Sequence, residues 1–333
     1  MRSSLFPAPC IWVTFLLALL QVALGSPYLP KRAKGPWKGL NTDFPDPSFM
    51  KAADGKWYAF GTNGNGKRVQ VAVSPDFSHW TLLDIDALPT LGSWETAKDH
   101  WAPDVVLRDD GKYAMTYSGE SKSDTPHHCV GTAVADKPMG PYVPSNTPLS
   151  CRLDQGGSID SAGFKDKDGS RYVVFKVDGN SVGHGGDCNN GNPPLVSTPI
   201  MLQKVKADGV TPIGDAVKIL DRNTNDGDGP LVEAPSLLLH NGVYFLFYST
   251  HCFTDSKYDV RWATASSITG PYHKSNVQLL KSGDYGGLIS PGGATVCGCG
   301  DRMLFHAWCD NSMKQRCMYV ADLVLSGTTA SIA

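Results

Sequence analysis

The hydrophobic and polar positions of this chain repeat one pattern five times. In each copy a glycine-containing turn is followed by a short run of aromatic and β-branched residues, at 54–62, 110–118, 168–176, 241–249 and 300–308. Asp-Gly or Asn-Gly opens four of the copies, and both dipeptides are strong signals for a tight hairpin turn. Each copy therefore predicts the turn and the second strand of a β-hairpin.

Two further elements accompany each turn. Upstream lies an acidic or small residue followed by a short apolar strand, beginning near Asp46, Asp104, Asp160, Glu233 and Gly293. Downstream, a third strand is visible at 71–74, 132–135 and 263–266. The connecting segments can supply a fourth strand. Five such units between about 41 and 325 predict an all-β fold, a five-bladed β-propeller.

Three carboxylates stand at the heads of these upstream strands. Asp46, Asp160 and Glu233 each precede an apolar run, where burial of a carboxylate is unfavourable unless it is paired or functional. For any one of them alone, a turn or strand-cap acid with local hydrogen bonds is the simpler interpretation. Because the first strand of every blade lines the channel of a propeller, three acids at equivalent points of the repeat are expected to meet at one end of the axis.

Composition and charge limit the kinds of partner that this protein can have. The 333 residues are 41% hydrophobic and 19% charged, which favours a large buried core and argues against disorder. The formal net charge is -2 and no basic stripe stands out, which argues against nucleic acid as a partner. A neutral sugar polymer would require no strong charge of either sign.

The N-terminus has the pattern of a secretory signal peptide. Arg2 is followed by an apolar run at 11–20 and by small residues at 23–25. The alternative, a membrane anchor, would need a longer apolar run. We therefore expect a signal peptide at 1–25, a linker or propeptide at 26–40 and the propeller catalytic domain at 41–333. The mature protein is expected to be secreted, extracellular and not bound to a membrane.

Cysteine usage agrees with export. Eight cysteines follow the signal segment, and an even count in an exported protein suggests disulfides. Cys129 with Cys151 is a plausible local pair, as are pairs among the last four cysteines. The complete connectivity cannot be deduced from the sequence.

Paired carboxyl groups suit the hydrolysis of sugars. One carboxylic acid protonates the leaving oxygen, while a second carboxylate either activates water or attacks directly. A third carboxylate nearby can keep the acid protonated through like-charge repulsion.

Four motifs in order, at 44–48, 101–105, 158–164 and 233–236, resemble those of glycoside hydrolase family 43. That family comprises five-bladed propellers acting as arabinanases, arabinofuranosidases and β-xylosidases. The resemblance implies that Asp46 is the general base and Glu233 the general acid. It implies that Asp160 keeps the acid protonated and orients it, and that the anomeric centre is inverted without a covalent intermediate.

The sequence departs from the family pattern at three points. Ser161 and Ala234 replace the Pro and Gly that often follow the second and third carboxylates, and Gly293-Ala294 stands where many members have His-Asn. The resemblance implies no required cofactor. It also implies a structural Ca²⁺ in the channel, held through water by His306, for which an ordinary core histidine is the alternative interpretation.

Several residues are candidates for contacting substrate. Phe44, Trp94 and Trp101 could stack on a sugar face, with blade packing as the alternative. Asp104 has either a structural or a pocket role. The glycine-rich insertion at 179–194 carries His184 and Asp187, which could contact substrate hydroxyls.

The leading hypothesis is a monomeric, exo-acting α-L-arabinofuranosidase acting on arabinan or arabinoxylan oligo- and polysaccharides. A β-xylosidase and an endo-1,5-α-L-arabinanase are the alternatives within the same chemistry, since the fold alone does not determine the substrate. A non-catalytic carbohydrate-binding propeller and a protein-interaction propeller are the alternatives from other classes.

Overall fold

The structure, a computed structural model, describes residues 35–297 and 301–333. The predicted signal peptide and most of the expected linker lie outside these residues. Within the described part, no helix is long and apolar enough to cross a bilayer. The helical content there consists of short 3₁₀ turns, and everything else that is regular is β-strand.

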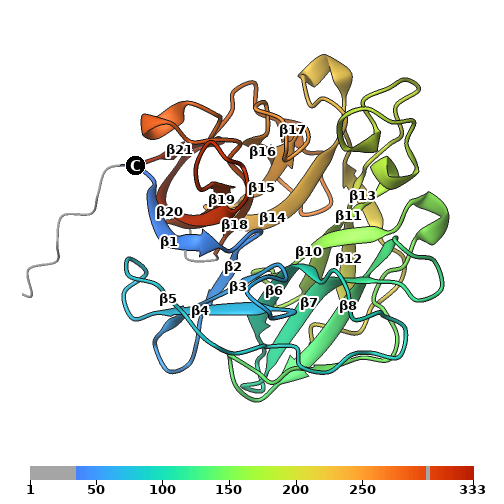
Figure 1. Cartoon of the computed structure of the whole chain (residues 1–333), viewed down its shortest axis with the longest axis vertical. Helices are drawn as coiled ribbons and strands as arrows, with labels where there is room; N and C mark the ends of the chain where they lie inside the picture. The colour runs from blue at the N-terminus through green and yellow to red at the C-terminus, as the bar shows by residue number, and fades with distance from the viewer. Residues whose placement is uncertain (1–34, 298–300) are drawn as a thin grey trace, which may run out of the picture. The chain divides into compact units, whose positions relative to one another are not determined.

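Five antiparallel sheets form the blades of a propeller (Figure 1), as the repeat predicted. Blade 1 contains β2 (Ser48–Lys51), β3 (Trp57–Gly61), β4 (Gln70–Ser74) and β5 (Thr81–Leu82). Blade 2 contains β6 (Trp101–Leu107), β7 (Tyr113–Glu120), β8 (His128–Ala135) and β9 (Val143–Pro144). Blade 3 contains β10 (Ser158–Lys165), β11 (Arg171–Val177), β12 (Ile200–Val205) and β13 (Val217–Leu220). Blade 4 contains β14 (Val232–His240), β15 (Val243–Thr250), β16 (Asp259–Ala265) and β17 (His273–Lys274).

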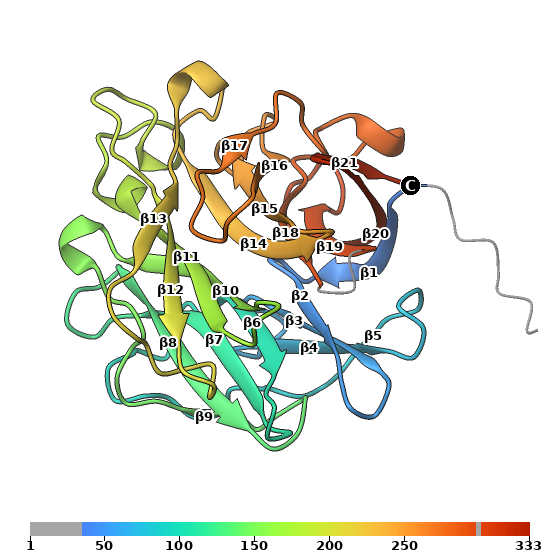
Figure 2. The same cartoon turned by 180° about the vertical axis from the view of Figure 1, so that it is seen from behind.

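Blade 5 closes the ring with strands from both ends of the described chain. It combines β18 (Gly292–Val296), β19 (Arg302–Trp308) and β20 (Arg316–Ser326) with the N-terminal strand β1 (Trp37–Asp43). Figure 2 shows β1 lying beside β20, and β21 (Thr329–Ile332) also pairs with β20. The propeller thus begins at Trp37, before the expected boundary at residue 41, because β1 supplies the fourth strand of the last blade.

The core lies between neighbouring blades. The second strand of each blade is covered on both faces, so every residue of β7 is buried and only the first residue of β15 is not. Apolar side chains of adjacent blades interleave, as Phe247 of blade 4 does with Phe305 of blade 5. This explains why the second strands have continuous aromatic and aliphatic runs instead of strict alternation.

Three disulfides join described residues. Cys129–Cys151 is the predicted local pair, and Cys309–Cys317 confirms a pair among the last four cysteines. The third, Cys188–Cys252, joins the blade 3 insertion to the loop between β15 and β16, across 64 residues of sequence. It had no signal in the spacing of the cysteines.

Candidate active site

All five inner strands are opened by one residue in the left-handed backbone region. These residues are Asp46 (φ 51), Ala102 (φ 42), Asp160 (φ 56), Ala234 (φ 51) and Gly293 (φ 58). In blades 2 to 5 the pairing of the inner strand shifts register at this point, as at a β-bulge. We call this left-handed residue the bulge position in all five blades. It turns the chain at the same end of every blade and so sets where side chains enter the channel.

The bulge corrects one expectation about the three acids. Asp46 and Asp160 occupy the bulge position itself, but Glu233 stands one residue before it, since Ala234 has the left-handed backbone in blade 4. The three carboxylates are therefore not at strictly equivalent points of the repeat. They still meet, because neighbouring positions on the first strands of blades 1, 3 and 4 open into the same end of the channel.

The backbone amide of each bulge residue links its blade to the preceding one. At four junctions the acceptor is a side chain from the preceding blade's second strand or directly after it: Thr62 Oγ1 for Ala102 (2.9 Å), Ser118 Oγ for Asp160 (3.0 Å), Ser249 Oγ for Gly293 (3.0 Å) and His306 Nδ1 for Asp46 (3.1 Å). At the junction of blades 3 and 4 the acceptor is Asp160 Oδ2, 3.0 Å from the Ala234 nitrogen.

Asp46 is held as a carboxylate. The Thr62 hydroxyl donates to its Oδ2 at 2.5 Å, and Arg316 Nη1 lies 3.2 Å from its Oδ1. Burial opposes ionisation, but Arg316, His306 and Thr62 outweigh it and hold the pKa of Asp46 well below its usual range. The side chain is still 20% exposed, so a water molecule can reach it.

Glu233 accepts two hydrogen bonds from buried donors. The Tyr258 hydroxyl donates to Oε1 at 2.7 Å, and Lys176 Nζ donates to Oε2 at 3.2 Å. Asp160 lies beside it, and burial together with the charge of Glu233 raises the pKa of Asp160 to about 8, although Lys176 opposes the rise. The Asp160–Glu233 pair therefore retains one proton at neutral pH.

The channel narrows directly below the carboxylates. A cavity of roughly 30 Å³ is lined from all five blades, with Asp46 and Asp160 in its wall, and has room for about one water molecule. Asp104 lies in its wall, with its pKa raised to about 6 by burial. Its Oδ2 accepts the Gly163 N–H at 2.8 Å, so Asp104 links β6 to β10 below the mouth. A substrate must therefore approach the carboxylates from the mouth.

The calcium ion implied by the resemblance stays a prediction. His306 is buried, its Nδ1 accepts the Asp46 amide, and its Nε2 has no hydrogen-bond partner. That nitrogen could meet a water molecule, but Ca²⁺ itself takes oxygen ligands. No group of three or more His, Cys, Asp or Glu side chains that could hold a metal forms within residues 35–297 and 301–333.

The aromatic residues expected at the mouth differ in their exposure and in their contacts. Trp101 is partly exposed at the start of β6, and its ring stacks on His128 with the centroids 3.7 Å apart. Phe44 is fully buried and packs against Gly61, so its ring cannot stack on a sugar and that expectation is wrong. Trp94 packs along the Tyr117 ring and donates to Ser145 O, which is a packing role within blade 2.

His184 is exposed in the blade 3 insertion, and only its backbone oxygen has a hydrogen-bond partner among the described residues. Asp187 is also exposed there. Their contact with substrate stays a prediction.

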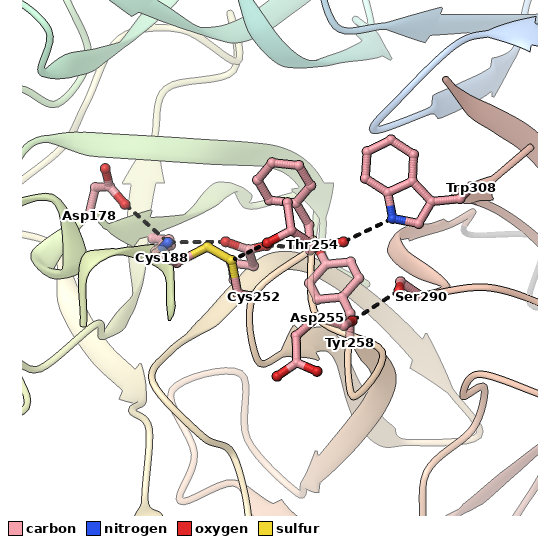
Figure 3. Close-up of a disulfide and its surroundings, with 11 residues drawn as sticks. Asp178, Cys188, Cys252, Thr254, Asp255, Tyr258, Ser290 and Trp308 are labelled. Atoms are coloured by element: carbon pink, nitrogen blue, oxygen red, sulfur yellow. Dashed lines mark hydrogen bonds and ion pairs between the residues drawn. A yellow bond between two sulfur atoms is a disulfide. The ribbon is translucent and has the colours of Figure 1, made fainter. Parts of the chain in front are cut away.

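One loop that the sequence did not single out borders both sides of the site. Residues 251–258 carry Tyr258, which binds Glu233, and Phe253, whose ring lies 4.9 Å from the Arg316 guanidinium that binds Asp46. Trp308 donates to Phe253 O at 3.2 Å and supports the loop from blade 5. Figure 3 shows the Cys188–Cys252 bridge, which holds this loop through Cys252, with Asp178 on the other side of the bridge.

We expect the double variant Cys188→Ser with Cys252→Ser to lose about 3–4 kcal/mol of unfolding free energy, because this bridge restrains a long segment of the unfolded chain. Urea unfolding measures the change. The double variant of Cys309 and Cys317, which are only 8 residues apart, is the matched control and should lose less. A larger loss in the control would contradict the prediction.

Lys176 is marked by its position in the sequence. It is the one charged residue inside the apolar run 172–177, where a cation needs a specific partner. Arg316, Tyr258 and Phe253 had no such signal, because their positions depend on strand register and on loop course.

Comparisons with known proteins identify the family of this chain. A model of the glycosyl hydrolases family 43 matches residues 40–319. The extracellular endo-alpha-(1->5)-L-arabinanase 1 of Bacillus subtilis is 28% identical over 304 residues, which cover 86% of this chain and 87% of that protein. A xylosidase/arabinosidase of Bacteroides ovatus is 28% identical over 218 residues, covering 60% of this chain and 61% of that protein.

A solved structure shares the fold. The crystal structure of a thermostable family-43 glycoside hydrolase aligns with a TM-score of 0.74 at 23% identity, over 90% of this chain and 96% of that one. The family model covers most of the chain, and the propeller is the same. This protein therefore belongs to glycosyl hydrolase family 43 and is a glycosidase.

Proposed function

We propose that this protein is a secreted, exo-acting, inverting α-L-arabinofuranosidase in which Asp46 is the general base and Glu233 the general acid. One observation carries the assignment of roles. A carboxylate held ionised, Asp46, and a carboxyl pair that retains a proton, Asp160 with Glu233, open at the same end of one channel. Glycoside hydrolysis requires this combination of an ionised and a protonated group, and in the inverting mechanism the ionised group is the base that activates water.

The step balances as a single displacement. Asp46 takes a proton from a water molecule while the water oxygen bonds to the anomeric carbon. The bond from that carbon to the leaving oxygen breaks, and Glu233 delivers its proton to that oxygen. Thr62 and Arg316 hold Asp46 in place, and Tyr258 and Lys176 hold Glu233.

The loop beside the site supports exo action. The loop 251–258 reaches from Tyr258, on the acid, to Phe253, beside the partner of the base. The Cys188–Cys252 bridge ties that loop to the blade 3 insertion. A surface groove of about 760 Å³ between β13 and β17 contains none of the three carboxylates. A polymer chain would need an open groove across the carboxylates themselves.

A second candidate is an endo-acting arabinanase. It is favoured by the Bacillus subtilis relative, which is named an endo-arabinanase and matches this chain over 87% of its own length. The chemistry would be the same, and only the products would differ.

The products from linear 1,5-linked arabinan separate the two candidates. Exo action releases arabinose alone from the start and also hydrolyses 4-nitrophenyl α-L-arabinofuranoside. Early arabino-oligosaccharides with no turnover of the aryl glycoside would establish the endo candidate instead. Turnover of 4-nitrophenyl β-D-xyloside alone would assign the sugar differently and identify a β-xylosidase. Proton NMR of the first-formed sugar tests inversion.

Asp160→Asn is expected to move the alkaline limb of the pH–kcat/KM profile to lower pH by about one unit or more. The negative charge of Asp160 helps the pair keep its proton, and burial with that repulsion raises the pKa of Asp160 to about 8. Without the charge the proton leaves at lower pH, so activity falls earlier as pH rises. Asp168→Asn, in the exposed hairpin turn of the same blade, is the control. An unmoved limb in Asp160→Asn would count against the role of Asp160.

Secretion is part of the proposal. It is supported by the signal-like N-terminus, by the disulfides and by the relative from Bacillus subtilis that is named extracellular. Expression of the full chain in a eukaryotic host, followed by N-terminal sequencing of the protein in the medium, tests it. Retention inside the cells with Met1 intact would reject it.

A further inference from the structure

Blade 3 differs from the other four blades in the side chain that faces the bulge position of the next blade. The residue paired with the position just before each bulge is Ser118 in blade 2, Ser249 in blade 4 and His306 in blade 5, and Thr62 serves the same purpose in blade 1. Each of these side chains accepts the bulge amide of the next blade. In blade 3 the paired residue is Lys176, opposite Ile159.

A lysine ammonium has no acceptor, so it cannot serve the amide of Ala234. Asp160 accepts that amide instead, at 3.0 Å. The exchange brings a buried cation and a second carboxylate to the one blade junction that carries Glu233. Departures from a repeat pattern of this kind are expected at functional positions.

Lys176 forms ion pairs with two carboxylates. Its side chain is only 1% exposed, and Nζ lies 3.0 Å from Asp178 Oδ1 and 3.2 Å from Glu233 Oε2. Burial opposes its charge, but Asp178, Glu233 and Asp160 outweigh burial and raise the pKa of Lys176 above its usual value. It is therefore a permanent positive charge across the working pH range.

We propose that Lys176 is a positioning residue for the general acid, which holds the Glu233 carboxyl in place and sets the pH above which the Glu233–Asp160 pair loses its proton, while Asp178 acts in the opposite direction. The proposal rests on the proposed role of Glu233. The positive charge of Lys176 favours the ionised pair, whereas the negative charge of Asp178 partly cancels it. The charges of the two residues together set the pH at which activity falls on the alkaline side.

The other charged and titratable groups around Glu233 come from several elements. Tyr258 precedes β16, and burial with the nearby Glu233 raises its pKa far above neutral pH, so it stays a donor. Asp46 precedes β2, His306 lies on β19 and Arg316 on β20. None of these residues is itself replaced in the Lys176 and Asp178 variants. Burial lowers the pKa of His128, on β8, and the charge of Asp178 opposes that lowering. The test therefore reads the alkaline limb, where His128 is already neutral.

The test compares pH profiles of kcat and KM for the protein and its variants on a natural arabinoside, because its leaving sugar cannot depart without a proton from the acid. Lys176→Met should move the alkaline limb up by about one pH unit, and Asp178→Asn should move it down by a similar amount. Lys176→Arg keeps the charge and should keep the limb at the wild-type position. Lys204→Met, on the exposed face of β12 in the same blade, should shift nothing.

Opposite shifts are the result that a merely structural role does not produce. Limbs that stay in place, or that move in the same direction in both variants, overturn the proposal. If Lys176→Met does not fold, as seen by thermal unfolding, Asp178→Asn decides alone, and a limb that is unmoved or moves up in it overturns the proposal. Full activity of Glu233→Gln would instead reject the assignment of the acid, which is a separate failure.

Discussion

Replacing Glu233 by Gln is expected to lower kcat on a natural arabinoside by a factor of roughly 10²–10⁴, the range that general acid catalysis contributes. The leaving sugar alkoxide is a strong base and cannot depart without a proton. A dinitrophenyl arabinofuranoside should lose far less, because dinitrophenolate leaves unaided. Measurement of kcat on both substrates therefore tests whether Glu233 delivers a proton.

The control for this variant must separate chemistry from packing. Glutamine offers one acceptor oxygen where Tyr258 and Lys176 each donate to a different oxygen of Glu233. Thermal unfolding should show whether the lost acceptor disturbs the fold, and Asp168→Asn, in an exposed turn, gives the baseline for a neutralised acid. Equal losses on both substrates would mean that Glu233 does not act as the acid.

The blades were predictable because their signals are local. An Asp-Gly turn needs a glycine that tolerates positive φ, and Gly111 (φ 83) and Gly169 (φ 85) have it. The closure of the ring was not predictable in the same way. β1 pairs with β20 from the other end of the sequence, so its partner is set by the finished propeller and not by a turn beside it.

The site was predictable in its carboxylates but not in its surroundings. The repeat placed Asp46, Asp160 and Glu233 at one end of the channel, yet it could not show that the bulge falls on Ala234 instead of Glu233. Strand register decides such a one-residue offset. Arg316 and Tyr258 reach the carboxylates from a third strand and from a loop, whose courses depend on packing among distant segments.

Aromatic residues near the motifs gave the least reliable expectations. Phe44 and Trp101 stand at similar places, just before the bulges of blades 1 and 2, but Phe44 is fully buried while Trp101 is partly exposed. The difference arises because Phe44 packs beneath Gly61, which leaves space for a ring that a side chain there would fill. A flat side chain beside a catalytic motif therefore indicates stacking on sugar only when its exposed face is known.

Asp46→Asn is expected to lower kcat by a similar factor of roughly 10²–10⁴, but to the same extent on the natural arabinoside and on the dinitrophenyl glycoside. Water must lose a proton during attack whatever the leaving group is, so a good leaving group cannot compensate for a missing base. Asparagine keeps an oxygen for the Thr62 hydroxyl, while Arg316 loses a charged partner.

Azide makes this expectation more specific. It is a nucleophile that needs no deprotonation, so it should restore turnover in Asp46→Asn and give a glycosyl azide of inverted configuration. The acid remains in place to protonate the leaving oxygen, because Asp160 and Glu233 are untouched. A loss that is large on the natural substrate and small on the dinitrophenyl glycoside would instead mark Asp46 as the proton donor and exchange the two roles. The pair of variants thus assigns base and acid by the dependence of each loss on the leaving group.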